Sequence, residues 1–282
     1  MKKHLVWIVA LLAGLLSSCH IDHEAEARAE QALREVDEYY HAEKSICDTL
    51  LDVATSYYLP DLAKGDTTLS EFTSSAQEAE CMLYEGIRHH DRAQQLKPDM
   101  EAYAAEMTKA YRLFLEVERN LDLLPKPYLR VVVNNRLARI NDQNYDYRQA
   151  LPFFRKELHY AIQTGDTTDI ALSYLHLAYI FNNIENGDST LYYSNEALLF
   201  APNLSGRIIS ALYNNLAFYL IKFEHEKNQG EKFLNSITFD GFTRDDSCRF
   251  FSVLVDYLLQ KGELTVADTL LNWTILHSDE KP

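Results

Sequence analysis

The chain has 282 residues, and 47% of them are hydrophobic, which is enough for a buried core and excludes a disordered chain. Its nine glycines and seven prolines are few for this length, which favours long helices over a loop-rich β fold. The formal net charge of −15, without any run of basic residues, indicates that the chain repels nucleic acid and anionic lipid surfaces.

The N-terminus has the order of a cleavable secretion signal. Lys2 and Lys3 precede an apolar segment, residues 5–16, and two serines and Cys19 follow. The segment is shorter than the roughly 20 apolar residues that cross a bilayer as a helix. The run Leu-Ser-Ser-Cys that ends at Cys19 resembles a bacterial lipobox. This resemblance implies that residues 1–18 are a signal peptide, that Cys19 is lipidated, and that residues 19–24 form a tether.

Residues 25–127 are expected to form an N-terminal region of long helices. Apolar residues recur at helical spacing over residues 24–58, and Pro60 ends this element. A second helix is expected from its cap at Ser70 to residue 96, and a third over residues 99–124. No alternating strand pattern of useful length interrupts the region.

The second half of the chain, residues 128–277, repeats a pair of residues. Leu137-Ala138, Leu177-Ala178 and Leu216-Ala217 follow at intervals of 40 and 39 residues (177 − 137 and 216 − 177). Leu254-Val255 comes 38 residues after the third pair. A period of this length is typical of stacked helix pairs, in which neither helix can bury its apolar stripe alone.

Around the second pair, the residues match the tetratricopeptide (TPR) signature of a large residue, leucine, a small residue, an aromatic, two small residues and a closing proline. They are Tyr174, Leu177, Ala178, Phe181, Thr190, Ala197 and Pro202. The preceding unit is similar but has Glu157 where the signature has alanine. The chain thus resembles the TPR family, and in particular lipid-anchored TPR proteins of Gram-negative gut anaerobes. The resemblance implies an all-α fold, a right-handed solenoid of antiparallel helix pairs that follows the N-terminal helical region.

Motifs that carry catalytic chemistry are absent from the sequence. No H-E-x-x-H, G-x-S-x-G, P-loop or G-x-G-x-x-G pattern occurs, so we expect neither an enzyme nor a metal or cofactor site. His89 and His90 are expected at a solvated helix end. Cys47 and Cys81 form one disulfide, or else these two and Cys248 are all buried thiols; the sequence leaves both alternatives open.

The TPR resemblance implies that the first helices of successive pairs line a concave groove. Six residues are then expected to face inward: Asn135, Arg139, Tyr179, Asn182, Asn214 and Phe218. Amides that pair with a backbone and rings that cover apolar side chains suit an extended peptide. The alternative is that the asparagines only satisfy hydrogen bonds between helices.

These features predict a lipid-anchored protein of the cell envelope, at the outer membrane, that binds a protein or peptide partner as an adaptor. The membrane is contacted only through the anchor, and nucleic acid is not a partner. A glycan-capture lipoprotein of a nutrient-uptake system is one alternative. The two tryptophans, Trp7 and Trp273, and the lack of insertions disfavour it. A periplasmic sensor or regulatory partner is another, and the side of the membrane is left open.

Three turns resemble acceptors for O-linked glycosylation in gut anaerobes, where Asp precedes Ser or Thr. Thr67, Thr167 and Ser189 each follow a Gly-Asp pair. The alternative is that glycine ends one helix and the polar residues cap the next, as the fold alone would select.

Replacing the lipobox cysteine tests the anchor. Only a thiol forms the thioether to diacylglycerol, so Cys19→Ser should give a chain that is either uncut or released from membranes. Detergent partitioning and the mass of the processed chain measure this. A Cys19→Ser chain that is cut and partitions like the wild type would exclude lipidation at this residue.

Overall fold

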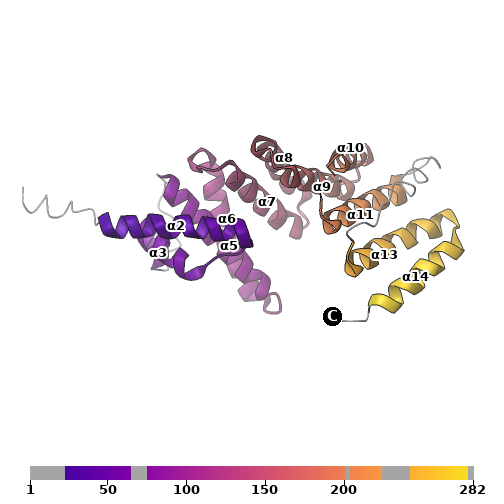
Figure 1. Cartoon of the computed structure of the whole chain (residues 1–282), viewed down its shortest axis with the longest axis horizontal. Helices are drawn as coiled ribbons and strands as arrows, with labels where there is room; N and C mark the ends of the chain where they lie inside the picture. Colours follow the sequence, from indigo (N-terminus) through magenta and orange to yellow (C-terminus); the bar gives the residue numbers. More distant parts are fainter. Residues whose placement is uncertain (1–22, 65–74, 201–203, 224–241, 279–282) are drawn as a thin grey trace, which may run out of the picture. The chain divides into compact units, whose positions relative to one another are not determined.

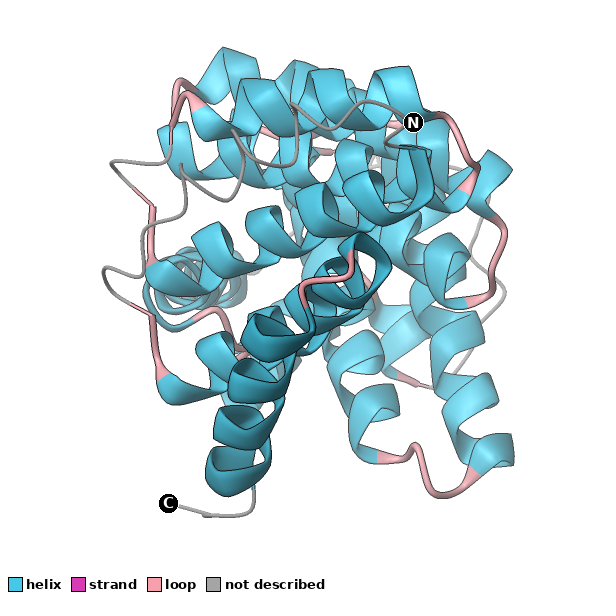
Figure 2. Cartoon of the chain, turned by 90° about the vertical axis from the view of Figure 1, so that its right-hand side faces the viewer, coloured by secondary structure: helices cyan, strands magenta, loops and turns pink. Residues whose placement is uncertain are grey.

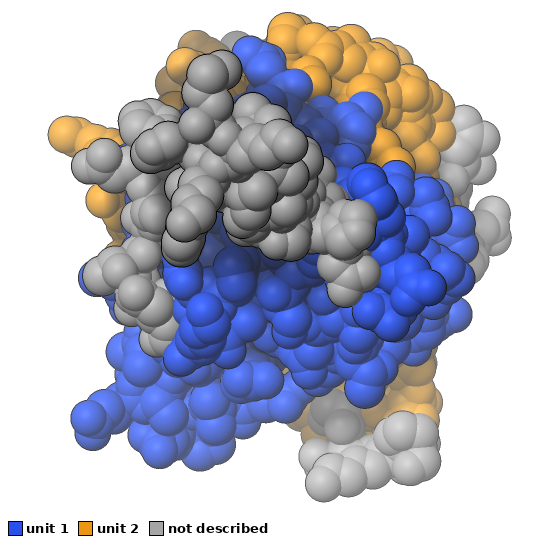
Figure 3. Space-filling view, turned by 90° about the vertical axis from the view of Figure 1, so that its left-hand side faces the viewer, with its two compact units in different colours: residues 1–125 blue, residues 126–282 orange. Residues whose placement is uncertain are grey.

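The computed structural model describes residues 23–64, 75–200, 204–223 and 242–278. Every regular element in these residues is a helix and none is a strand (Figure 2), which confirms the all-α class. The chain divides into two compact units, residues 1–125 and 126–282, which Figure 3 shows in separate colours. The signal peptide and Cys19 lie outside the described residues.

The described part of the first unit is built from five α-helices and one 3-10 helix (Figure 1). Their bounds are α2 His23–Glu43, α3 Asp48–Tyr58, α4 Pro60–Ala63, α5 Ala76–Gln95, α6 Met100–Arg119 and η1 Leu121–Leu123. The helix α3 packs against both α2 and α5, and α5 packs against α6.

The sequence predicts one helix over residues 24–58, but the structure has two, so that prediction is wrong. Lys44 adopts the left-handed backbone conformation, with φ of 55°, and the chain is not helical again until α3. The break lets α3 pack back against α2 and bury Leu51 and Ala54. No glycine or proline stands at the break, so apolar spacing alone does not reveal it.

Two other helix ends also differ from the sequence prediction. The helix α5 begins at Ala76, and its cap is Ser75, whose Oγ accepts a hydrogen bond from the Glu78 amide at 3.1 Å. Ser70, the expected cap, lies outside the described residues. The helix α6 ends at Arg119, and η1 takes up most of the remaining length to residue 124.

The helices α5 and α6 approach each other closely at Gly86. A Cβ atom at this position would lie 2.7 Å from Cε1 of Phe114, nearer than real side chains come. Phe114 is fully buried, so it has no room to move away. Glycine is required here by packing, although inside a helix it costs roughly 0.5–1 kcal/mol relative to alanine.

The ion pair of Glu85 and Arg88 lies within α5, and both of its side chains bond to α3 in the first unit. Nη2 of Arg88 donates to both carboxylate oxygens of Glu85 at 2.7 Å, and Nη1 donates to Asp52 on α3. Thr55, also on α3, donates its hydroxyl hydrogen to Glu85. Glu85 is only 1% exposed, and these donors compensate for its removal from water.

The second unit contains the repeat region. The bounds of its helices are α7 Pro127–Gln143, α8 Tyr147–Thr164, α9 Thr167–Asn183, α10 Gly187–Leu198, α11 Gly206–Phe223, α13 Arg244–Lys261 and α14 Leu264–Ser278 (Figure 1). Helices that follow one another in the chain pack together: α7 with α8, α9 with α10, and α13 with α14. The helices α9 and α11 also contact each other directly.

All four repeated residue pairs lie in the core of this unit. Leu137-Ala138 is on α7, Leu177-Ala178 on α9, Leu216-Ala217 on α11 and Leu254-Val255 on α13. Each of these side chains is at most 6% exposed, and the three alanines have no exposed surface. The small residue lets a neighbouring helix approach closely, and the leucine supplies apolar area to bury.

Side-chain hydrogen bonds join alternate helices of the second unit. Nδ2 of Asn215 on α11 donates to the Leu175 carbonyl oxygen of α9 at 3.2 Å. The hydroxyl of Ser210 on α11 lies 3.4 Å from Oδ1 of Asp246 on α13. The helices α9, α11 and α13 are therefore linked in sequence.

A large ring at Ala178 tests this packing. Ala178 is fully buried, so Ala178→Trp should overpack the seam and destabilise the protein by about 1–3 kcal/mol. Ile162 of α8 is 54% exposed, so Ile162→Trp places the same ring at the surface and is the control that should leave the melting temperature unchanged. Equal melting temperatures for the Ala178→Trp protein and the wild type would show that Ala178 is not in a packed seam.

Candidate functional site

The six residues expected to face a groove lie on three helices of the second unit. Asn135 and Arg139 are on α7, Tyr179 and Asn182 on α9, and Asn214 and Phe218 on α11. Arg139, Tyr179 and Phe218 are exposed, whereas Asn135 and Asn214 are half-buried and Asn182 is buried. We call these six residues the polar face.

Asn135 on α7 takes part in hydrogen bonds that join three helices. Its Nδ2 donates to Oε1 of Glu157 on α8 at 3.0 Å, and Nδ1 of His176 on α9 lies 3.1 Å from the same oxygen. Glu157 is 2% exposed and stands where the TPR signature has alanine. Asn135 therefore forms a hydrogen bond between helices. This agrees with the alternative that the asparagines serve helix packing rather than ligand binding.

Asp142, which the sequence analysis did not single out, is on α7 and hydrogen-bonds to Tyr179 of α9. Burial raises the pKa of Asp142, although Arg139, His176 and a hydrogen bond with Tyr179 all act to lower it. This hydrogen bond joins an exposed ring of the polar face to α7. Arg139 and Asp142 are three residues apart on α7 and therefore lie on the same side of the helix. This spacing is the feature by which the sequence could have indicated Asp142.

Several buried polar atoms on the same three helices have no hydrogen-bond partner among the described residues; Oδ1 of Asn134 is one, and three others belong to Asp142 and to the polar face. These three are Oδ1 of Asp142, Oδ1 of Asn182 and Oδ1 of Asn214. Leaving a buried polar atom unsatisfied costs about 1–3 kcal/mol. Proteins satisfy nearly all such atoms, and a cluster of exceptions beside exposed aromatic rings is a candidate ligand site.

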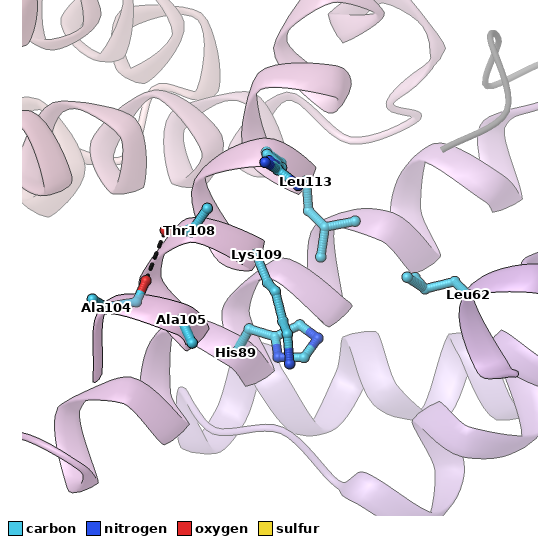
Figure 4. Close-up of a pocket in the computed structure, with 8 residues that line it drawn as sticks. Leu62, His89, Ala104, Ala105, Thr108, Lys109 and Leu113 are labelled. Atoms are coloured by element: carbon cyan, nitrogen blue, oxygen red, sulfur yellow. Dashed lines mark hydrogen bonds between the residues drawn. The ribbon is translucent and has the colours of Figure 1, made fainter. Parts of the chain in front are cut away.

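A pocket of about 380 Å³ lies in the first unit, where the sequence analysis placed no site (Figure 4). Helices α4, α5 and α6 line it, and His89 of α5 is one of the lining residues.

His89 and His90 were expected at a solvated helix end, and this is wrong. His89 Nδ1 lies 2.6 Å from Oε2 of Glu106 on α6, and His90 is 5% exposed. The pairing depends on how α5 meets α6, which the sequence alone does not specify.

The three described cysteines are free thiols, so the alternative of a disulfide between Cys47 and Cys81 is wrong. The other alternative holds only for Cys81, because Cys47 and Cys248 are half-buried. Burial raises the pKa of Cys81 to about 12, and a contact with Thr55 only partly opposes this. Cys81 therefore stays a neutral, unreactive thiol at neutral pH.

Two of the three candidate glycosylation residues fall within the described part of the chain; Thr67 does not. Thr167 is the exposed first residue of α9, next to Gly165 in the left-handed conformation and the cap Asp166. Ser189 is half-buried in the first turn of α10, where Asn186 is the cap rather than Asp188. The capping alternative therefore accounts for Gly165 and Asp166 but not for Gly187 and Asp188, and glycosylation stays a prediction.

In the part of the chain that the structure describes, no helix combines the length and hydropathy needed to span a membrane. The same residues contain no group of three histidines, cysteines or carboxylates close enough to share a metal ion.

Comparison with known proteins gives a likeness of fold. The crystal structure of BtubC (BKLC) from P. vanneervenii superposes with a TM-score of 0.50 and 17% sequence identity, over 75% of this chain and 95% of that one. At this identity the likeness concerns the helical fold and not the activity. No family model and no curated protein matches the chain.

The pH dependence of stability tests the environment of Asp142. Because its pKa is raised in the folded state, ionisation above that pKa opposes folding, and this destabilisation disappears below the ordinary value near 4. Asp142→Asn should therefore raise the melting temperature at pH 7, and the difference should vanish as the pH falls below about 4. The exposed Asp256 provides the control variant Asp256→Asn, which should have no effect. A lower melting temperature for Asp142→Asn at pH 7 would contradict this account.

Proposed function

We propose that this chain is a lipid-anchored envelope adaptor whose second unit is a TPR-like solenoid of antiparallel helix pairs, and that the polar face binds an extended segment of a partner protein. The anchor in this proposal rests on the lipobox-like run ending at Cys19. The observation that carries the binding function is the set of unpartnered polar atoms on α7, α9 and α11.

The solenoid is supported by the agreement between sequence period and packing. Residue pairs 38–40 positions apart are all buried, and each lies on the first helix of its repeat. Hydrogen bonds join these first helices to one another, from Asn135 to His176 and from Asn215 to the Leu175 carbonyl. Stacking of this kind presents equivalent positions of successive first helices on one surface.

An extended peptide fits the chemistry of the polar face better than the alternatives do. Its backbone N–H groups supply the donors that the oxygens of Asn182 and Asn214 lack. These atoms are covered, so a ligand reaches them once the amides turn outward. The exposed rings of Tyr179 and Phe218 then cover apolar side chains of the ligand.

Site-specific photo-crosslinking tests where a partner sits. A benzoylphenylalanine at Tyr179 or Phe218 should crosslink a partner in envelope preparations. The same group at Tyr192, which is 56% exposed on α10, is the control and should not crosslink it. Crosslinks of the same partner at Tyr192 alone would place binding elsewhere.

Variants of the polar face test the energetics with that partner. Arg139→Glu and Asn182→Ala should each weaken binding by roughly three- to tenfold, as for the loss of one hydrogen bond, without loss of helicity. Arg148→Glu makes the same charge change at an exposed position of α8 and should bind as the wild type does. Wild-type affinity in both polar-face variants would refute the proposed site.

A further inference from the structure

The pocket in the first unit has apolar walls. Leu62 of α4 faces Leu113 of α6 across it, and Ala104 and Ala105 of α6 complete the apolar lining (Figure 4). The hydroxyl of Thr108 donates to the Ala104 carbonyl oxygen at 2.7 Å, so this polar group is already satisfied. The apolar part of the pocket therefore offers no free hydroxyl to a polyhydroxylated ligand.

The polar lining of the pocket is basic. Lys109 and Arg112 of α6 and His89 of α5 are its remaining members. Glu106 accepts hydrogen bonds from Lys109 at 2.8 Å and from His89 at 2.6 Å. Burial opposes ionisation of Glu106, but these two partners outweigh burial and lower its pKa. One carboxylate is thus shared by two basic side chains.

Arg112 adds a further positive charge to the lining of the pocket. It is exposed, and it forms no ion pair with any carboxylate of the described residues. Lys109, Arg112 and the ionised Glu106 give the site a net positive charge even with His89 neutral. In a chain whose formal charge is −15, a basic site beside an apolar pocket is complementary to an anion with an apolar body.

The volume limits the size of that anion. At about 30 Å³ for each water-sized group, 380 Å³ holds on the order of a dozen non-hydrogen atoms. A carboxylate accepts two parallel hydrogen bonds from a guanidinium, and a straight hydrocarbon chain suits walls of leucine and alanine. We propose that this pocket binds a free medium-chain carboxylate, with its hydrocarbon between Leu62 and Leu113 and its carboxylate on Arg112 and Lys109.

Calorimetric titration with decanoate tests the proposal. The full chain carrying Cys19→Ser is used, so that no attached acyl group competes. Decanoate should bind with one-to-one stoichiometry, while decan-1-ol, which lacks the charge, should bind about tenfold more weakly. Butanoate, which lacks the apolar body, should show no measurable binding.

Two variants distinguish decanoate binding in this pocket from non-specific binding to other apolar segments. Arg112→Gln should weaken decanoate binding about tenfold, whereas Arg119→Gln, which changes an exposed arginine near the end of the same helix, should not. Ala105→Trp fills the pocket from an exposed helix position and should abolish binding with helicity unchanged. Absence of decanoate binding, or wild-type binding in both Arg112→Gln and Ala105→Trp, would overturn the proposal.

Discussion

The second unit depends on the burial of a leucine and an alanine on each of three helices, and of Leu254 and Val255 on a fourth. Leu177 and Ala178 of α9 show how this works: the alanine leaves room for a neighbouring helix, and the leucine fills the space between them. A single helix has nowhere to bury such a pair, so each helix is stable only against its neighbours. Because the pairs recur every 38–40 residues, the polar positions between them recur as well, and this places Arg139, Tyr179 and Phe218 on successive first helices.

Several polar side chains are buried in this apolar unit, and some of their atoms have hydrogen-bond partners while others have none. Glu157 occupies a position where the TPR signature has alanine, and Asn135 and His176 satisfy one of its oxygens. Its other oxygen, Oε2, has no partner among the described residues, and the same holds for Oδ1 of Asp142 and Oδ1 of Asn182. A well-satisfied group adds specificity to helix packing, while an unsatisfied one lowers stability and gains from a ligand. Satisfied and unsatisfied atoms thus occur on neighbouring helices and, in Glu157, in the same side chain.

The first unit is built on different interactions. Gly86 lets α5 contact α6 closely. Hydrogen bonds from Thr55 to Glu85 and from Arg88 to Asp52 join α5 to α3. The pocket beside Arg112 combines apolar walls with cations, whereas the polar face combines amides with exposed rings. The ligands that we propose for the two units therefore differ in chemistry: an anionic amphiphile for the first and a peptide for the second.

The sequence by itself determined the helical class, the four buried residue pairs and the helical positions of the polar face, because helix packing imposes a regular spacing that is visible in the chain. It did not show the break at Lys44, where no glycine or proline marks the end of a helix. Only the tertiary structure decided that Asn135 is engaged by Glu157, that Cys47 and Cys81 are unpaired, and that His89 meets Glu106 beside a pocket. Each of these depends on which helix faces which at distances of a few ångströms, and periodicity within one helix carries no information about its neighbour's side chains.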